Sequence, residues 1–171
     1  MINNAFKDLE KLRNDFFIEL GKLSEKQLNK KYKNNWSINE HLYHVWLAET
    51  LTEKYIRKKS SYPEFIKEIS FLVYFRTFAL RFFLNLGVKV KAPQPTTVFP
   101  ENMNLNELNE KWNESRKSFE NLIKDLIEKK LQRKAIFRHP LMGRINLKLT
   151  LYFFNFHFKH HQKKINFLKN I

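Results

Sequence analysis

The spacing of apolar residues predicts amphipathic helices along most of the chain. Between residues 2 and 23, apolar side chains recur at the i, i+3, i+4 interval of one helix face. Residues 105–130 repeat the same interval. The apolar positions of the two stretches are Phe6, Leu9, Leu12, Phe16, Phe17 and Leu20, and then Leu105, Leu108, Trp112, Phe119, Leu122, Ile123 and Leu126.

Local start and stop signals predict three further helices. Ser37 followed by Glu40 forms a capping box, in which each side chain bonds the backbone N–H of the other residue. Pro63 suits the first position of a helix, and Gly87 suits the position just after its end. The predicted helices therefore cover residues 2–23, about 37–58, about 63–86, 105 to about 130, and about 146–168.

The connections between these helices indicate the architecture. Residues 88–103 hold three prolines, so we expect an extended connector that runs the length of a bundle. We find no internal repeat and no composition shift that would mark a second domain. The sequence thus predicts an all-α, four-helix bundle as a single domain over residues 1–171. Any β-pairing should be at most a short one within residues 88–103.

Composition narrows the class of protein. Hydrophobic residues make up 43% of the 171 residues, with 17 Phe, which is enough for a folded core. The absence of Cys excludes disulfides, thiolate nucleophiles and cysteine-bound zinc, and it suits a reducing cytoplasm. The first 17 residues contain acids where a signal peptide has an apolar block. We expect a cytoplasmic protein with no membrane partner.

The net charge of +15 has two interpretations. It could mark a nucleic-acid or anionic-membrane partner, or it could be a solvated surface rich in Lys. The basic residues are mostly scattered among acids rather than gathered in blocks. We favour the solvated surface over a nucleic-acid partner, and keep a basic binding module for nucleic acid or an acidic partner as an alternative.

Three histidines of the last predicted helix are candidates for chemistry. With ~100° per residue, His157 and His161 lie within ~40° of each other on the same face as Phe154 and Ile165. His160 falls ~100° away, on the flank. Side chains at i and i+4 lie side by side, so the two inward imidazoles can converge on one ion.

The second predicted helix supplies a third candidate. His44 centres a stripe with Leu47, Ala48, Leu51 and Tyr55, while His41 lies ~60° from it. A divalent ion held by His44, His157 and His161 would keep positions open for water or substrate, as catalytic sites do. Only neutral imidazoles ligate, and free His titrates near ~6.5, so acid should compete with the ion.

Other roles for these residues remain open at this point. A histidine on an apolar face can simply be a hydrogen-bonded core residue. Glu40 could serve as a fourth ligand or a base, but its place in the capping box already explains it, and we favour that structural role.

Four segments together resemble one known family. Residues 36–44 (WSINEHLYH) resemble a W-S-x-x-E-x-x-x-H signature, and residues 157–165 (HFKHHQKKI) resemble an H-x-x-x-H-x-x-Q-I type ending. Residues 139–144 (HPLMGR) resemble an H-P-x-x-G segment, and Pro-Glu at 100–101 fits as well. These motifs belong to the DinB/YfiT-like family of bacterial four-helix-bundle proteins, and they occur in the expected order over nearly the whole chain.

The resemblance implies a metal site and a range of activities. In the family the three histidines bind a divalent ion, commonly nickel, zinc or iron, which maps to His44, His157 and His161. Relatives include thiol-dependent transferases and isomerases. The resemblance thus favours a metal-dependent transferase or hydrolase acting on a small molecule, with a low-molecular-weight thiol as one candidate partner. An inactive member of the family, and a homodimer, are also to be tested.

One departure from the family pattern leaves the subfamily and substrate open. Many members read H-H-R-G-Q, whereas here Gln162 directly follows His161.

Overall fold

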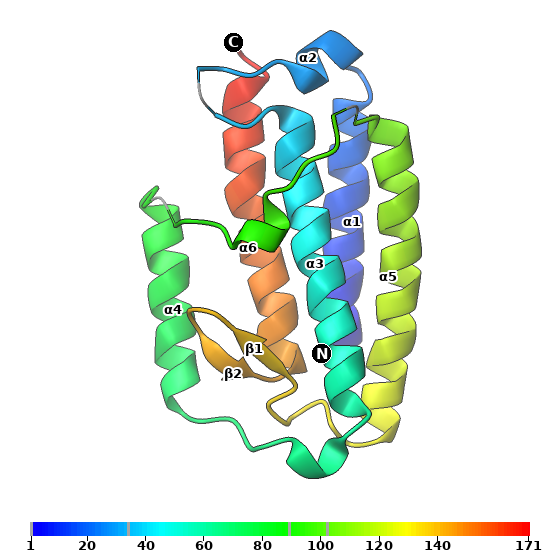
Figure 1. Ribbon diagram of the computed structural model, residues 1–171, viewed down its shortest axis with the longest axis vertical. Coiled ribbons are helices and arrows are strands. Elements are labelled where there is room, and N and C mark those ends of the chain that lie inside the picture. Colours follow the sequence, from blue (N-terminus) through cyan, green and yellow to red (C-terminus); the bar gives the residue numbers. More distant parts are fainter. Residues whose placement is uncertain (1, 34, 89, 102) are drawn as a thin grey trace.

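The architecture is a bundle of four long helices (Figure 1). The computed structural model describes residues 2–33, 35–88, 90–101 and 103–171. The long helices are α1 (Ile2–Leu20), α3 (Ile38–Ser60), α5 (Leu105–Glu128) and α6 (Leu147–Leu168). The predicted all-α, four-helix bundle is confirmed. Of the predicted connections, residues 34, 89 and 102 lie outside the described residues.

The core follows from the apolar stripes of these helices. Helix α6 packs against α1 and α3, and α3 packs against α5. Phe154 of α6 joins one apolar cluster, near the hairpin end of the bundle, and Phe158 joins a second one with Trp112. All four long helices contribute to both clusters, so the two clusters hold α3 and α6, which carry the histidines discussed below, in a fixed relation to each other.

The N-terminal half starts and stops close to the predicted boundaries. Helix α1 ends at Leu20, before Gly21. A one-turn helix, α2 (Glu25–Asn29), was not predicted, although Ser24 and Gln27 form a capping box around its start. The capping box of Ser37 and Glu40 opens α3 as predicted.

The helix predicted over 63–86 is correct only in its second part. Pro63–Phe65 forms a single 3₁₀ turn, and α4 spans Leu72–Asn85. In between, the chain is extended: the carbonyl of Lys67 accepts a 2.9 Å bond from the Ala135 amide, and Ile66 is buried in the core. Tertiary bonding to another segment therefore replaces the first turns of the predicted helix.

The β-pairing expected within 88–103 lies elsewhere. Strands β1 (Phe137–His139) and β2 (Gly143–Ile145) form an antiparallel hairpin with Phe137 opposite Ile145. The Nδ1 atom of His139 accepts bonds from two backbone amides of the turn, each 3.2 Å long. Within the described part of 88–103, regular structure is limited to a 3₁₀ turn at Gln94–Thr96.

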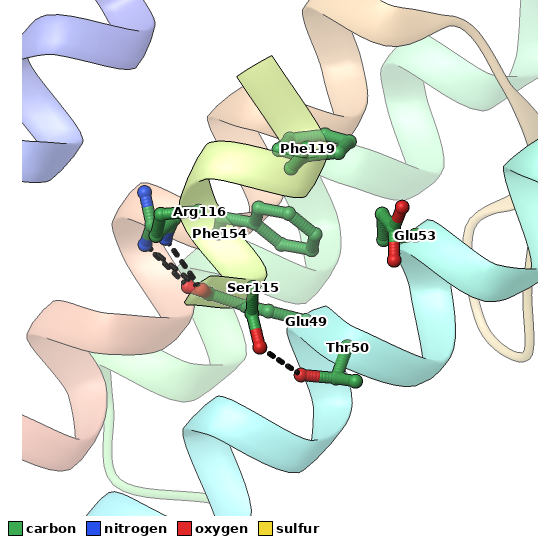
Figure 2. Close-up of a pocket in the computed structure, with 7 residues that line it drawn as sticks. All are labelled: Glu49, Thr50, Glu53, Ser115, Arg116, Phe119 and Phe154. Atoms are coloured by element: carbon green, nitrogen blue, oxygen red, sulfur yellow. Dashed lines mark hydrogen bonds and ion pairs between the residues drawn. The ribbon is translucent and has the colours of Figure 1, made fainter. Parts of the chain in front are cut away.

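A buried ion pair joins α3 to α5 (Figure 2). Both oxygens of Glu49 accept 2.9 Å bonds from the guanidinium of Arg116, and one also accepts from the indole of Trp112. Arg116 also pairs with Glu10 of α1 at 3.2 Å, which extends the link to a third helix. The adjoining crevice has about 10 Å³ of free volume. That is room for about one water molecule, so we assign this cluster a structural role.

Within the ranges that the structure describes, none of the helices combines the length and the apolar character that crossing a lipid bilayer requires.

Candidate metal centre

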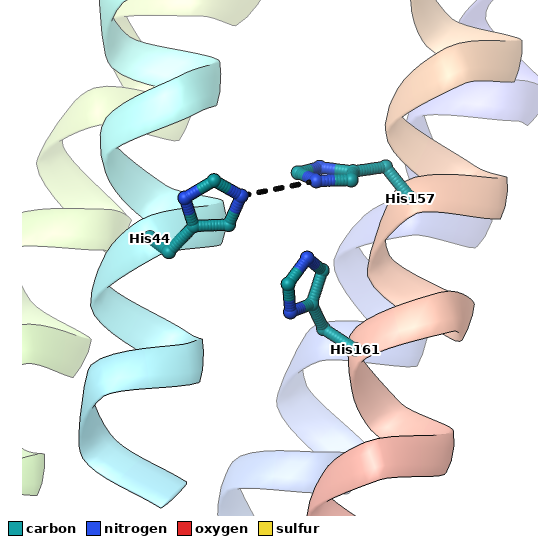
Figure 3. A group of neighbouring side chains, drawn as sticks. All are labelled: His44, His157 and His161. Atoms are coloured by element: carbon teal, nitrogen blue, oxygen red, sulfur yellow. Dashed lines mark hydrogen bonds between the residues drawn. The ribbon is translucent and has the colours of Figure 1, made fainter. Parts of the chain in front are cut away.

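Three histidines from two facing helices converge in the bundle (Figure 3). His44 projects from α3, and His157 and His161 project from successive turns of α6. One ring nitrogen of each lies within 4.8 Å of those of the other two. His44 and His161 are buried, whereas His157 keeps part of its surface accessible. The structure therefore brings together the three residues that the facing argument selected.

The spacing of the ring nitrogens suits a shared ion. The Nε2 atoms of His44 and His157 are 3.3 Å apart. Two nitrogens bound at 2.0–2.1 Å to one tetrahedral zinc lie ~3.3 Å from each other. The ring of His161 is equally close to both, with centroids 4.7 Å from His157 and 4.8 Å from His44. The three residues thus fit one divalent ion without large movement.

The proline-containing connector orients His44. The Nδ1–H of His44 donates a 2.9 Å bond to the carbonyl of Thr96, which lies in the 3₁₀ turn of the connector. This bond fixes the proton on Nδ1, and it leaves the Nε2 lone pair directed at His157. Metal-binding histidines in proteins are held by this kind of bond to a carbonyl.

His41 is a fourth histidine at the cluster, although its place ~60° from the stripe of His44 had left it out of the predicted ligand set. Its Nδ1 lies 3.0 Å from the Nδ1 of His161, and its side chain is buried. When His161 carries its proton on Nδ1 and donates it to the Nδ1 of His41, the Nε2 of His161 is left without a proton. The i−3 relation of His41 to His44 was the available signal, because residues three apart share a helix flank.

Trp36 covers the cluster from the turn before α3. Its ring is stacked on that of His161, with an interplanar angle of 11°, and it lies 5.0 Å from the ring of His44. Phe99 of the connector contacts Trp36 at 5.2 Å. The sequence analysis identified Trp36 only through the family resemblance, so its position over the histidines is new.

His157 shows an unsatisfied polar atom. Its Nδ1 is buried and has no hydrogen-bond partner among the described residues. Its ring is stacked on Phe153, 5.1 Å away. A buried ring nitrogen without a partner costs free energy. Buried polar atoms without a partner are few in native proteins, and a functional role is one explanation for them.

Burial keeps these rings neutral. Desolvation lowers the pKa of His44, and it lowers the pKa of His157 and His161 well below the ordinary value of 6.5. The neighbouring Lys164 charge acts in the same direction. Burial also lowers the pKa of His41, to about 3. The ring nitrogens therefore hold lone pairs at neutral pH, as ligands must.

The remaining candidates lie outside the cluster. Glu40 bonds the Ser37 amide at 2.8 Å and pairs with Lys31 at 2.7 Å, so its capping role is confirmed. His160 lies on the flank as predicted, where its ring interacts with the backbone of Leu84 in α4.

The predicted stripe around His44 is less buried toward the C-terminal end of α3. Tyr55 is 42% exposed, and its ring contacts Phe137 of the hairpin. Leu51 is also exposed. The inward face of the helix in this part is formed instead by Thr52 and Ile56.

Comparison with known proteins identifies the family. A model of the DinB superfamily matches residues 8–165, which is most of the chain. The chain therefore belongs to the DinB superfamily, as the motifs had indicated. Comparisons with curated proteins and with solved structures find no match. Family membership and the buried histidine cluster are together compatible with a metal-binding protein.

Proposed function

We propose that this protein is a metal-dependent enzyme whose divalent ion is held by His44, His157 and His161. The observation that carries the proposal is the convergence of three ring nitrogens within 4.8 Å, supplied by two facing helices. The hydrogen bond from His44 to Thr96 supports it, because that bond leaves the Nε2 of His44 free for an ion. His41 supports it as well, because its Nδ1 lies where it can accept the Nδ1–H of a His161 that binds through Nε2.

Three neutral nitrogen ligands determine which reactions a bound divalent ion would promote. A divalent ion in such a site lowers the pKa of bound water, or of a bound thiol, and leaves coordination positions open. The chain itself holds His44 by a bond to Thr96, places His41 beside His161, and covers the cluster with Trp36. We therefore propose hydrolysis or thiol-dependent transfer on a small molecule, with zinc, nickel or iron as the ion. A cytoplasmic location accords with a chain that has no Cys.

Metal analysis of the purified, tag-free chain tests the proposal. We expect about one divalent ion per chain in the wild type and loss of most of it in His44→Ala and in His161→Ala. The matched control is His160→Ala, which removes an imidazole next to His161 that does not belong to the converging group. Equal loss in all three variants, or a wild type that takes up no Zn²⁺, Ni²⁺ or Fe²⁺, would overturn the proposed site.

A further inference from the structure

Helix α4 carries a stripe of large apolar side chains on the side turned away from the bundle. The outer stripe consists of Phe71, Phe75, Phe78, Phe82 and Leu86, which are 86, 67, 67, 51 and 64% exposed. At ~100° per residue they fall within a sector of ~80°. The opposite side of the helix is buried at Val73, Thr77 and Leu80. Figure 1 shows α4 at the outer edge of the molecule.

The outer stripe is larger than an ordinary surface patch. A phenylalanine side chain presents ~200 Å² when it is fully exposed. Weighted by their exposed fractions, the stripe and its apolar neighbours Leu72, Tyr74 and Phe83 present on the order of 900 Å². The largest patch on a typical monomer is ~300–600 Å². A stable protein interface buries ~800 Å² per partner, so this face is large enough for one.

The outer stripe itself holds no charged residue. Between residues 71 and 86 the charged residues are Arg76 and Arg81, which are exposed and lie on the two flanks, at least ~60° from the nearest member of the stripe. The guanidinium of Arg81 bonds the hydroxyl of Tyr152 on α6 and lies over its ring. Arg76 reaches the hairpin beside Gly143. A helix that docks on an anionic bilayer is rich in Lys and Arg, whereas α4 has two arginines and both of their guanidinium groups reach back to α6 and the hairpin, which favours a protein partner over a lipid surface.

We propose that the outer stripe is the interface between two copies of this chain, with α4 packed antiparallel on α4 of the partner. A two-fold interface must be complementary to itself, and an uncharged apolar stripe meets that requirement. On a molecule with a net charge of +15, the five residues of the stripe also form a surface without charged side chains. The proposal does not depend on the metal site.

Cysteine cross-linking locates the interface, because the chain has no cysteine of its own. Phe78 lies at the middle of the stripe, so antiparallel packing brings it next to its own copy at the two-fold axis. Phe78→Cys should form an intermolecular disulfide under mild oxidation. Ile18→Cys, at an equally exposed site on α1, is the matched control and should remain monomeric under the same conditions. Equal cross-linking of both variants would overturn the proposal.

Light scattering over a dilution series measures the assembly itself. The wild type should have the mass of a dimer, and Phe75→Glu with Phe78→Glu should reduce it to that of a monomer. Ile18→Glu should leave the dimer intact, and circular dichroism should show the same helical signal in all three proteins. A monomeric wild type, or a dimer that persists in the double variant, would contradict the proposal. Monomeric protein that sediments with phosphatidylglycerol vesicles would identify the face as a lipid-binding one and would also overturn it.

Discussion

Single hydrogen bonds set the direction of the ligand nitrogens at the histidine cluster. A His161 that binds an ion through Nε2 carries its proton on Nδ1, and His41 lies 3.0 Å away as an acceptor for that proton. Removing such an acceptor weakens metal binding by ~10–100-fold in characterised sites. We therefore predict a loss of that size for Co²⁺ binding in His41→Leu, measured by absorbance titration.

Two further variants separate this positioning role from simple packing. His41→Asn offers a side-chain oxygen near the position of Nδ1, so it should recover most of the Co²⁺ affinity. His160→Leu removes a ring that contacts His161 at nearly the same centroid distance, 5.3 Å against 5.1 Å, and it should leave the affinity unchanged. If His41→Leu binds Co²⁺ normally while His44→Ala does not, then His41 has no positioning role although the metal site stands.

His139 supplies a residue-level test of pH dependence away from the cluster. Burial lowers its pKa to about 4, against 6.5 in the unfolded chain. Below pH 6.5 the unfolded state therefore binds more protons than the folded state, and stability falls as pH falls toward 4. From pH 6.5 to pH 5 this residue should cost about 2 kcal/mol. Urea unfolding at the two pH values should show a smaller drop in His139→Asn than in the wild type, and equal drops would contradict the prediction.

The ~100° advance per residue predicted which histidines lie together, because residues on the inward face of a helix point at a neighbouring helix. His44, His157 and His161 each centre an apolar stripe, and that property is readable from spacing. His41 lies on a flank, where burial depends on which element packs against the helix, so its i−3 relation to His44 was the one signal that spacing offered. The Thr96 carbonyl has no residue-type signal at all, since any residue carries a backbone carbonyl.

At the scale of elements, α3 and α5 are joined by a charge pair that lies inside the apolar core. Glu49 and Arg116 are 5% and 3% exposed. Removing one partner of such a pair leaves an uncompensated buried charge and costs about 3–5 kcal/mol. We predict that Arg116→Leu loses stability of that size in chemical denaturation at pH 7.

Further variants at the Glu49–Arg116 pair, and at one exposed pair, test whether the buried charge causes the loss of stability. Burial raises the pKa of Glu49, and removal of Arg116 raises it further, so part of the lost stability should return as acid protonates Glu49. Combining Arg116→Leu with Glu49→Gln should recover stability at pH 7, because neither of the two positions then holds an unpaired charge. Lys124→Ala breaks an exposed pair with Glu120 and should change stability by less than about 0.5 kcal/mol. Equal costs at the buried and exposed pairs would contradict this account.

The elements that the sequence analysis placed correctly are those with a long apolar period or a capping box. Helices α3, α5 and α6 end within about two residues of their predicted limits. The start of α4 was wrong because the backbone there bonds a segment distant in sequence, with the carbonyl of Lys67 accepting from Ala135. The hairpin, which pairs Phe137 with Ile145, is local and was missed for another reason. Strands of three residues are too short to show a period of two.

At the scale of the whole molecule, an ion bound at the cluster would link α3 to α6 and would stabilise the folded chain. An ion that binds only the folded chain stabilises it by ~2.7 kcal/mol at a free concentration 100 times its dissociation constant. For a chain of this length that corresponds to roughly 5–10 °C in melting temperature. A chelator should therefore lower the melting temperature of the metal-loaded protein by this amount at pH 7.

The effect of pH on the change in melting temperature caused by the chelator shows whether the three histidines are buried. Ordinary histidines titrate near ~6.5, so an exposed site would already have lost its ion to protons at pH 5. Burial lowers the pKa of His157 and His161 well below 6.5, which moves this competition to lower pH than free histidine would give. Acid should lower the melting temperature with and without chelator, because unfolding then takes up protons, but the difference between the two should persist at pH 5.

His44→Ala should show no chelator effect at either pH while it still folds on its Phe- and Leu-rich core. A difference that vanishes at pH 5 in the wild type would mean that the three rings titrate as exposed histidines do, and that the ion is not held in the buried cluster.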